Sequence, residues 1–312
     1  MEVVVAIVLL NWNGVKDTTD CIASLLKSTY PKLAIYVVDN ASGNNEAKIL
    51  AQEFPAINVL AQSENLGFCA GNNVGIRKAI ADGAEYIVVL NNDTLVPPDA
   101  IETLLVEFNK ISLAGAISPV ILEHPATEKV WFSNAVWQHE KAQFRLSTID
   151  EKYEDLKTKE PYISEFACGC CLFTSAEIIN KVGLLDERYF AYYDEAEWCK
   201  RLEKHGYKSF VTPQTFIYHK VSQSVAGLVS TYLLTRNRLL WMKENLSSSE
   251  RLKSFVYLNK EFLWHLLNKW GFVKGEYTKD HSRAFLRGVL DYRLKRFGRW
   301  GKGTEKIIFK RK

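Results

Sequence analysis

The sequence predicts an α/β protein, with a mainly parallel sheet flanked by helices and a helical C-terminal extension. Four short apolar runs alternate with helical segments over the first 95 residues, and each run leads into a loop that contains asparagine or aspartate. After residue 225 the pattern is helical almost to the end of the chain. We therefore expect an α/β domain over residues 1–225 and a helical, basic extension over residues 226–312.

Apolar runs rich in Val, Ile and Leu at 3–10, 34–38 and 86–90 predict buried parallel strands, and 57–60 predicts a short third strand of the same sheet. Capped or amphipathic segments over 17–30, 46–54 and 71–82 predict the helices between them. Further strands are expected at 117–122, 130–132, 166–173, 209–212 and 215–219, and helices at 175–182 and 194–205. The polar, poorly periodic segment 141–159 predicts a mobile loop.

Composition limits the compartment and the class. The six cysteines show no paired zinc spacing, so we expect reduced, mostly buried thiols in a cytoplasmic protein. The apolar start is too short for a signal peptide and lacks a basic leader. No uninterrupted apolar run reaches the roughly 18 residues of a membrane-spanning helix.

Charge is distributed unevenly along the chain. Residues 281–312 contain eleven Lys and Arg against two acidic residues, which makes this stretch +9 and residues 1–280 −5. A basic, amphipathic end predicts a membrane-surface anchor, and the alternative is a helical cap packed on the first domain. No recognition motif for nucleic acid is present, so none is expected as a partner. The apolar stripe consists of Phe255, Leu258, Phe262, Leu263, Leu266 and Leu267.

Polar side chains follow the predicted parallel strands, where ligands bind in open α/β sheets. Asn11, Asp39 and Asp93 end three of these strands. A carboxylate at Asp39 could accept the N3–H of a uracil or thymine ring, and Asp93 could hold a divalent cation on a diphosphate. Each residue alone could be a turn or cap, but the set together favours a nucleotide site.

The loop after the third strand supports the same interpretation. Asn65, Gly67 and Gly71 would let the backbone approach a flat ligand closely. Asn72 and Asn73 are expected at a helix N-terminus, where backbone amides favour phosphate.

A second cluster begins the helix expected at 194–205. Asp194, Glu195 and Glu197 follow aromatic residues, so an ionised carboxylate could take the proton of an attacking hydroxyl in a partly enclosed site. The alternative is simple compensation of the helix dipole. His219 ends another strand, where it could be structural or could bind metal or phosphate.

These residues resemble those of the family 2 glycosyltransferases with the GT-A fold, especially the bacterial rhamnosyltransferase-like branch. The resemblance covers about residues 3–225 and keeps the family's motif order and spacing. Its motifs are Leu10-Asn-Trp-Asn13, Val37-Val-Asp-Asn-Ala-Ser42, Asn65-Leu-Gly-Phe-Cys-Ala-Gly-Asn-Asn73, Leu90-Asn-Asn-Asp-Thr94, Gly169-Cys-Cys-Leu172, Val182-Gly-Leu-Leu-Asp-Glu-Arg-Tyr-Phe190, Tyr193-Asp-Glu-Ala-Glu-Trp-Cys-Lys-Arg201 and His219-Lys-Val-Ser222.

The resemblance implies an inverting transfer from a dTDP- or UDP-linked sugar to a glycan or lipid-linked acceptor, and its branch favours dTDP-rhamnose. Asn91-Asn92-Asp93 stands where the family has Asp-x-Asp, with Asp93 on Mg²⁺ or Mn²⁺. The glycine motif that starts at Gly169 belongs with the nucleotide-sugar residues. Asp194-Glu195 stands where the family has a Glu-Asp pair, which puts the catalytic base at Glu195.

Two alternatives compete with this interpretation. A nucleotidyltransferase would show a Gly-rich, basic loop after the first strand, which Asn11-Trp-Asn-Gly14 does not provide. A non-catalytic nucleotide- or sugar-binding homologue is suggested by Asn91, which removes one charge from the expected metal site. The lipid-linked acceptor and the basic tail together predict a cytoplasmic protein at the inner face of the cell membrane.

Overall fold

The computed structural model describes residues 3–125, 128–147, 151–220, 227–273 and 277–309. The chain forms two compact units. The first unit consists of Met1–Val136, Arg145–Asp186 and Trp198–Val221, and the second of Trp137–Phe144, Glu187–Glu197 and Ser222–Lys312. The second unit therefore includes two short segments from within residues 1–225, in addition to the C-terminal extension.

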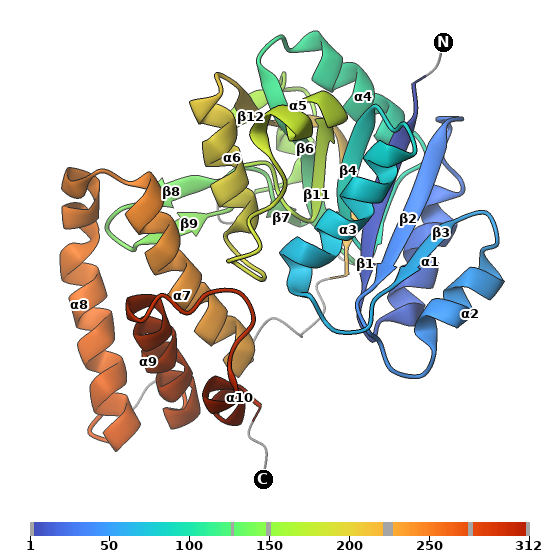
Figure 1. Ribbon diagram of the computed structural model, residues 1–312. Helices are drawn as coiled ribbons and strands as arrows, with labels where there is room; N and C mark the ends of the chain where they lie inside the picture. The colour runs from blue at the N-terminus through green and yellow to red at the C-terminus, as the bar shows by residue number, and fades with distance from the viewer. Residues whose placement is uncertain (1–2, 126–127, 148–150, 221–226, 274–276, 310–312) are drawn as a thin grey trace. The chain divides into compact units, whose positions relative to one another are not determined.

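The first unit is built on one mixed sheet (Figure 1). Its parallel half contains β1 (Val5–Asn11), β2 (Leu33–Asp39), β3 (Asn58–Ala61) and β4 (Tyr86–Asn91), in the order β4-β1-β2-β3. β11 (Cys171–Ser175) joins β4 antiparallel and leads to β6 (Ala114–Glu123), β12 (Lys208–His219) and β10 (Tyr162–Ser164). The two short strands β5 (Thr94–Leu95) and β7 (Val130–Phe132) pair with β12 and β6.

Helices flank this sheet and give it the expected α/β character: α1 (Val15–Leu25), α2 (Glu46–Glu53), α3 (Gly67–Ala81), α4 (Ala100–Lys110) and α5 (Ala176–Val182). Residues 5–9 of β1 are completely buried, as the unbroken apolar run predicts. The Ser175 hydroxyl caps α5 by accepting from the Ile178 amide, which confirms the predicted cap.

Three expectations about local structure were wrong. The strands expected at 209–212 and 215–219 form one strand, β12, with a register shift near Pro213. The strand expected from 166 begins only at Cys171. The segment expected to be a loop contains β9 (Gln143–Arg145), which pairs with β8 (Val136–Gln138), and a 3₁₀ turn at Tyr153–Asp155. Short strands with few apolar residues lack a clear alternating pattern.

The start of α3 is a further correction. The helix begins at Gly67 rather than Gly71, which places Asn72 and Asn73 more than one turn inside it. A Cβ atom on Gly71 would lie 2.5 Å from Leu10 Cδ1, so this glycine allows α3 to pack closely on β1. The Asn73 side chain is buried and bonds the backbone N–H and C=O of Leu185. The expectation of two asparagines at a helix N-terminus was therefore wrong.

The second unit contains α7 (Leu228–Asn245), α8 (Ser248–Trp270), α9 (Lys279–Arg293) and α10 (Lys302–Ile308). Its apolar core joins α7, α9 and α10 to the segment before Asp194 and includes Phe190, Tyr232, Leu233, Ala284 and Ile308. Among the described residues, no helix combines the length and the apolar character needed to cross a bilayer.

Candidate active site

The carboxyl ends of β1 and β2 carry a buried hydrogen-bond network centred on Asn11. The Asn11 amide donates to Asp39 Oδ1 at 2.8 Å, to Glu46 Oε2 at 2.9 Å and to Ser42 Oγ at 3.1 Å. Its carbonyl oxygen accepts from the Thr18 hydroxyl at 2.7 Å. Asn11 is completely buried, so it fixes Asp39 in place and is not itself accessible to a ligand.

Asp39 is held through both carboxylate oxygens, because Oδ2 also accepts from the backbone N–H of Ser42 at 3.1 Å. A carboxylate has about four acceptor positions, so capacity remains for a further donor. Glu46, which accepts from Asn11 and from the Gly14 backbone N–H, belongs to the same network. Sequence reasoning missed Glu46 because it looked like an ordinary first-turn helix residue.

The loop that contains Asn65 and Gly67 is tied to the end of β2 by Asn40. The Asn40 amide donates to Asn65 Oδ1 and to the Gly67 carbonyl, each at 3.1 Å, and its oxygen accepts from the Leu66 N–H at 2.8 Å. Gly67 has φ +83°, a conformation that glycine adopts at little cost. The expected Asn65–Gly67 segment thus lies beside the Asp39 network. The Asn72 amide instead bonds the Phe68 carbonyl of its own helix, and Gly71 lies against Leu10 and the Asn40 amide.

The end of β4 brings together Asn91, Asn92 and the turn at Gly169. The Asn91 backbone N–H donates to the Cys170 carbonyl at 2.9 Å, and the Cys171 N–H closes the turn on the Cys168 carbonyl at 3.0 Å. The Asn92 amide donates to the Thr18 hydroxyl at 2.8 Å, which links this strand end to the Asn11 network. All six cysteine side chains are buried, as expected.

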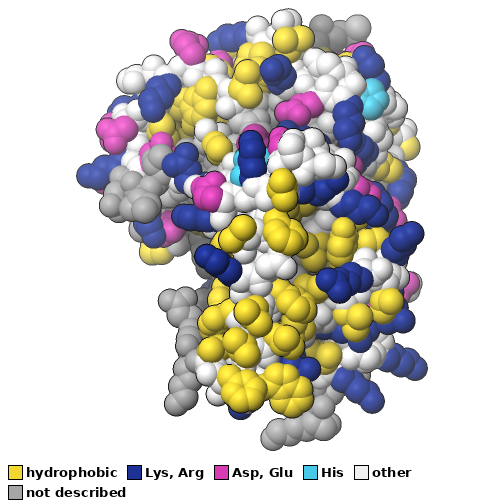
Figure 2. Space-filling view, turned by 90° about the vertical axis from the view of Figure 1, so that its left-hand side faces the viewer, with side chains coloured by type: hydrophobic (Ala, Val, Ile, Leu, Met, Phe, Trp, Pro, Cys, Tyr) yellow, Lys and Arg dark blue, Asp and Glu magenta, His cyan; other side chains and the backbone are white. Residues whose placement is uncertain are grey.

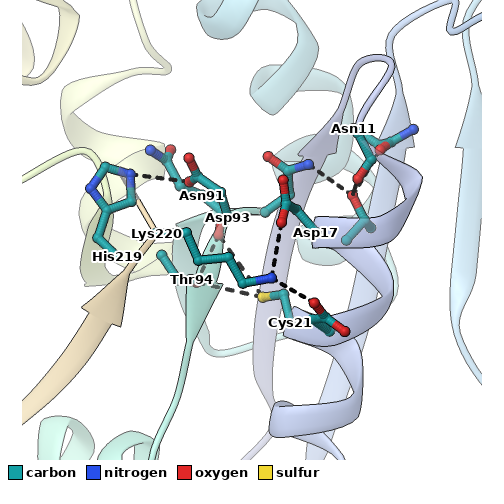
Figure 3. A network of polar contacts seen from close by, with 12 residues as sticks. Asn11, Asp17, Cys21, Asn91, Asp93, Thr94, His219 and Lys220 are labelled. Atoms are coloured by element: carbon teal, nitrogen blue, oxygen red, sulfur yellow. Dashed lines mark hydrogen bonds and ion pairs between the residues drawn. The ribbon is translucent and has the colours of Figure 1, made fainter. Parts of the chain in front are cut away.

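Asp93 and His219 lie next to each other, with His219 Nε2 3.1 Å from Asp93 Oδ1 (Figure 3). β5 pairs with the end of β12, and this pairing brings the two residues together. The Trp131 ring packs edge-on against the His219 ring, with 4.6 Å between the ring centroids. The described residues contain no group of three His, Cys, Asp or Glu that could hold a metal. Asp93 Oδ1 and His219 Nε2 are therefore two candidate ligand atoms, and a cation held there would need further ligands from elsewhere.

Lys220 is a positive charge at this edge that sequence reasoning did not identify. Its ammonium lies 2.6 Å from Asp20 Oδ2 and 2.9 Å from Asp17 Oδ1, and its backbone N–H donates to the Asp93 carbonyl. Burial opposes ionisation of Lys220, but the hydrogen bonds with Asp20 and Asp17 outweigh it and raise the pKa. The Lys220 ammonium therefore stays charged and paired with Asp17 and Asp20, while it is the Lys220 backbone that contacts Asp93.

The second unit holds the two acids at the start of α6 (Asp194–Lys204). The loop before them contains three non-glycine residues with left-handed backbone: Phe190 (φ 66°), Tyr192 (φ 69°) and Tyr193 (φ 67°). Such conformations persist only when the surroundings impose them. The Asn237 amide on α7 donates to the carbonyls of residues 189, 191 and 192 at 2.7–2.9 Å, and this clamp holds the loop in shape.

Burial sets the protonation of the two acids. Desolvation, followed by the charge of Glu195, raises the pKa of Asp194 well above its ordinary value. Desolvation also raises the pKa of Glu195, against the opposing effect of backbone and Asp194 hydrogen bonds. Burial thus opposes the ionisation that a helix N-terminus favours.

Other motif residues anchor α6 within the first unit. The Trp198 indole N–H donates to the Gly183 carbonyl at 2.8 Å, and the Arg201 guanidinium donates to the carbonyls of Val182 and Leu184 at 2.9 and 2.7 Å. These bonds give the conspicuous Trp and Arg of the motif a structural role.

Solved structures share this architecture. A mannosyltransferase, PcManGT from Pyrobaculum calidifontis in complex with GDP-Man and Mn²⁺, matches 93% of this chain and 87% of its own, with a TM-score of 0.56 and 14% identity. GalNAc-T7 with UDP, GalNAc and Mn²⁺ matches 94% of this chain and 57% of its own, with a TM-score of 0.60 and 13% identity. The fold is the GT-A fold of glycosyltransferases, as expected.

Residues 6–183, more than half of the chain, match the model of glycosyl transferase family 2, and the protein belongs to this family. It is 24% identical over 272 residues to the dTDP-rhamnosyl transferase RfbF of Shigella flexneri, which covers 82% of this chain and 86% of the relative. It is 23% identical over 245 residues to an N-acetylglucosaminyl-diphospho-decaprenol L-rhamnosyltransferase of Mycobacterium tuberculosis, covering 70% and 76%. The rhamnosyltransferase-like resemblance is thereby confirmed.

Proposed function

We propose that the protein transfers a sugar from a nucleoside-diphosphate sugar to a hydroxyl group with inversion at the anomeric carbon. The observation that carries this proposal is the convergence of Asp39, Asp93 and His219 at one edge of the sheet, linked through Asn11, Thr18 and Asn92. Residues 1–225 would hold the donor and the base. Residues 226–312 would support the loop that carries the base.

Asp39 would accept the N3–H of a thymine or uracil base, with Asn65, Gly67 and Gly169 lining the donor site. Asp93 and His219 would hold Mg²⁺ or Mn²⁺, and Asn91 would add an amide in place of the usual carboxylate. The cation, when bound, would neutralise charge on the leaving diphosphate.

Glu195 would act as the general base. The acceptor hydroxyl attacks the anomeric carbon on the face opposite the diphosphate, the C–O bond to the diphosphate breaks, and Glu195 takes the hydroxyl proton. A raised pKa makes Glu195 a stronger base than an ordinary glutamate once it is deprotonated. Asp194, whose pKa burial raises well above its ordinary value, would titrate together with Glu195 as one system.

The relatives favour a particular substrate pair. RfbF is named for dTDP-rhamnosyl transfer, and the mycobacterial relative is named for an acceptor on diphospho-decaprenol. We propose dTDP-rhamnose as donor and a lipid-linked glycan as acceptor, with the protein at the cytoplasmic face of the membrane. The second candidate, a non-catalytic binding homologue, is favoured only by Asn91, which reduces the charge available to a cation.

The test is rhamnose transfer from dTDP-rhamnose to N-acetylglucosaminyl-diphospho-polyprenol, followed by mass spectrometry, with NMR of the product linkage. We expect an inverted anomeric configuration and a loss of more than 100-fold in kcat for Glu195→Gln. Asp194→Asn keeps a hydrogen-bond donor beside Glu195 and should retain more activity than Asp194→Ala. Near-full activity of Glu195→Gln would assign the base elsewhere, and donor binding without transfer to any acceptor would favour the non-catalytic homologue.

A further inference from the structure

The helix α8 in the second unit is inverted relative to an ordinary surface helix. Its inward side is polar: Ser254 donates to the His139 carbonyl, Glu261 pairs with Arg238, and His265 and Asn268 bond Ser282. Its outward side is apolar, with exposed fractions of 37% to 68%. This outward face consists of Leu252, Phe255, Val256, Leu263, Leu266 and Trp270.

The spacing of these residues makes the outward face one continuous stripe. At about 100° per residue, they fall within roughly 60° of one line along the helix, directly opposite the polar side. Within α8, whose residues are all described, only Asn259 interrupts the stripe. Figure 2 shows hydrophobic side chains gathered over the part of the surface that α8 presents to the viewer. A helix that turns its polar side inward and its apolar side outward is built to cover that apolar side with something else.

Lysine side chains on both sides of the apolar stripe indicate the charge of the surface that would cover it. Lys253 and Lys260 lie about 80–100° to one side, and Lys269 lies about 100° to the other. Residues 251–312 contain seventeen Lys and Arg against five acidic residues. A second copy docked on the stripe would bring like charges together, which disfavours self-association. An anionic surface suits both the cations and the apolar stripe.

We propose that the outward face of α8 docks flat on an anionic lipid bilayer. An apolar helix face bordered by lysines binds in the interface of such a membrane, with the side chains inserted among the acyl chains and the ammonium groups at the phosphates. Trp270 and Phe272, both more than half exposed, place aromatic rings at the C-terminal end of α8, and such rings favour the headgroup region. This inference deepens the proposed function. It rests on that function in one respect, because a lipid-linked acceptor is the reason for the protein to bind a membrane.

The test is flotation of the full-length protein with phosphatidylglycerol vesicles and with phosphatidylcholine vesicles, in the absence of donor and acceptor. We expect flotation with the anionic vesicles and at least tenfold weaker binding to the neutral ones or in 1 M salt. The triple change Phe255→Gln, Leu263→Gln and Trp270→Gln should reduce binding at least tenfold, and so should Lys253→Gln, Lys260→Gln and Lys269→Gln.

The matched control replaces three exposed apolar residues of the first unit, Val106, Leu113 and Ile163, with glutamine. This control should float like the unchanged protein, and thermal unfolding should show that every variant is folded. Failure of the unchanged protein to float, or unaltered flotation of the apolar α8 variant, would overturn the proposal. A dimer in light scattering that the α8 variant converts to a monomer, without any flotation, would assign the face to a second copy. Because flotation needs no turnover, none of these outcomes depends on the transfer reaction.

Discussion

At the scale of single residues, the proposed chemistry depends on two carboxyl groups at the start of α6, Asp194 and Glu195. Burial raises the pKa of both carboxyl groups. For Asp194, desolvation contributes most to this rise, and the charge of Glu195 adds to it. A proton therefore remains on the pair at pH values where ordinary carboxyls are ionised, and the two groups titrate as one system.

The first prediction concerns pH. The base must be deprotonated to work, so activity should fall as pH drops through the raised pKa of the pair. We expect the acidic limb of the kcat/KM profile to lie above the ordinary glutamate pKa of about 4.3. Circular dichroism at each pH separates titration from unfolding. An acidic limb at or below the ordinary value, in folded protein, would contradict the assignment of Glu195.

The second prediction concerns Asn237, which bonds three carbonyls of the loop before Asp194. Asn237→Ala leaves these buried carbonyls without their donor and releases the left-handed backbone, so the free energy of unfolding should fall by about 3 kcal/mol. Because this loop carries the base, kcat should fall at least tenfold while the dissociation constant for dTDP stays unchanged.

The control for this clamp is Asn259→Ala, which removes an exposed amide that bonds the Phe255 carbonyl of its own helix. This control should leave the free energy of unfolding nearly unchanged and kcat within about twofold of the unchanged protein. An equal loss of dTDP affinity in Asn237→Ala would show that the clamp supports the whole protein rather than the base loop.

At the scale of elements, close packing of helices depends on small residues at particular crossings. α7 and α9 cross at Gly288, where an added Cβ would lie 2.7 Å from the Tyr232 carbonyl and 3.0 Å from Thr235 Cβ. Because the nearest atom is a backbone carbonyl of α7, which cannot rotate away as a side chain could, the two helices would have to move apart. The glycine thus sets how α9 rests on the helix that carries Asn237.

Gly288→Ala is therefore expected to lower the free energy of unfolding by about 1–3 kcal/mol, despite the better helix propensity of alanine. Urea titration measures this change. Gly303→Ala on α10, where the nearest atom lies 3.8 Å from the added Cβ, should be neutral or slightly stabilising. Similar behaviour of the two variants would show that the α7–α9 crossing has room to spare.

The strands and their polar ends were predictable because buried parallel strands are continuous apolar runs that stop abruptly at Asn11, Asp39 and Asn91. The start of α3 was not, because Gly67 appeared to be a loop glycine and the next glycine a helix start. The Asn40 and Asn237 clamps join residues 25–48 positions apart, and no local pattern signals such pairs. Burial of Asp194 depends on tertiary packing in the same way.

At the scale of the whole molecule, each unit contributes a different part of the proposed reaction. The first unit carries Asp39, Asp93 and His219, and the second carries Asp194, Glu195 and the helices that hold their loop. The residues proposed for nucleotide binding and the proposed base thus belong to separately packed units. Substitutions in one core should accordingly affect donor binding and transfer to different degrees.

The central claim is that the edge formed by Asp39, Asp93 and His219 binds a nucleoside diphosphate together with a divalent cation. Isothermal titration calorimetry of UDP, dTDP, GDP and CDP, each with and without Mn²⁺, tests it most directly. We predict binding of a pyrimidine diphosphate that Mn²⁺ strengthens at least tenfold, and loss of this Mn²⁺ effect in Asp93→Asn but not in the exposed-site control Asp155→Asn. Absence of binding by all four nucleotides, with or without Mn²⁺, would contradict the account.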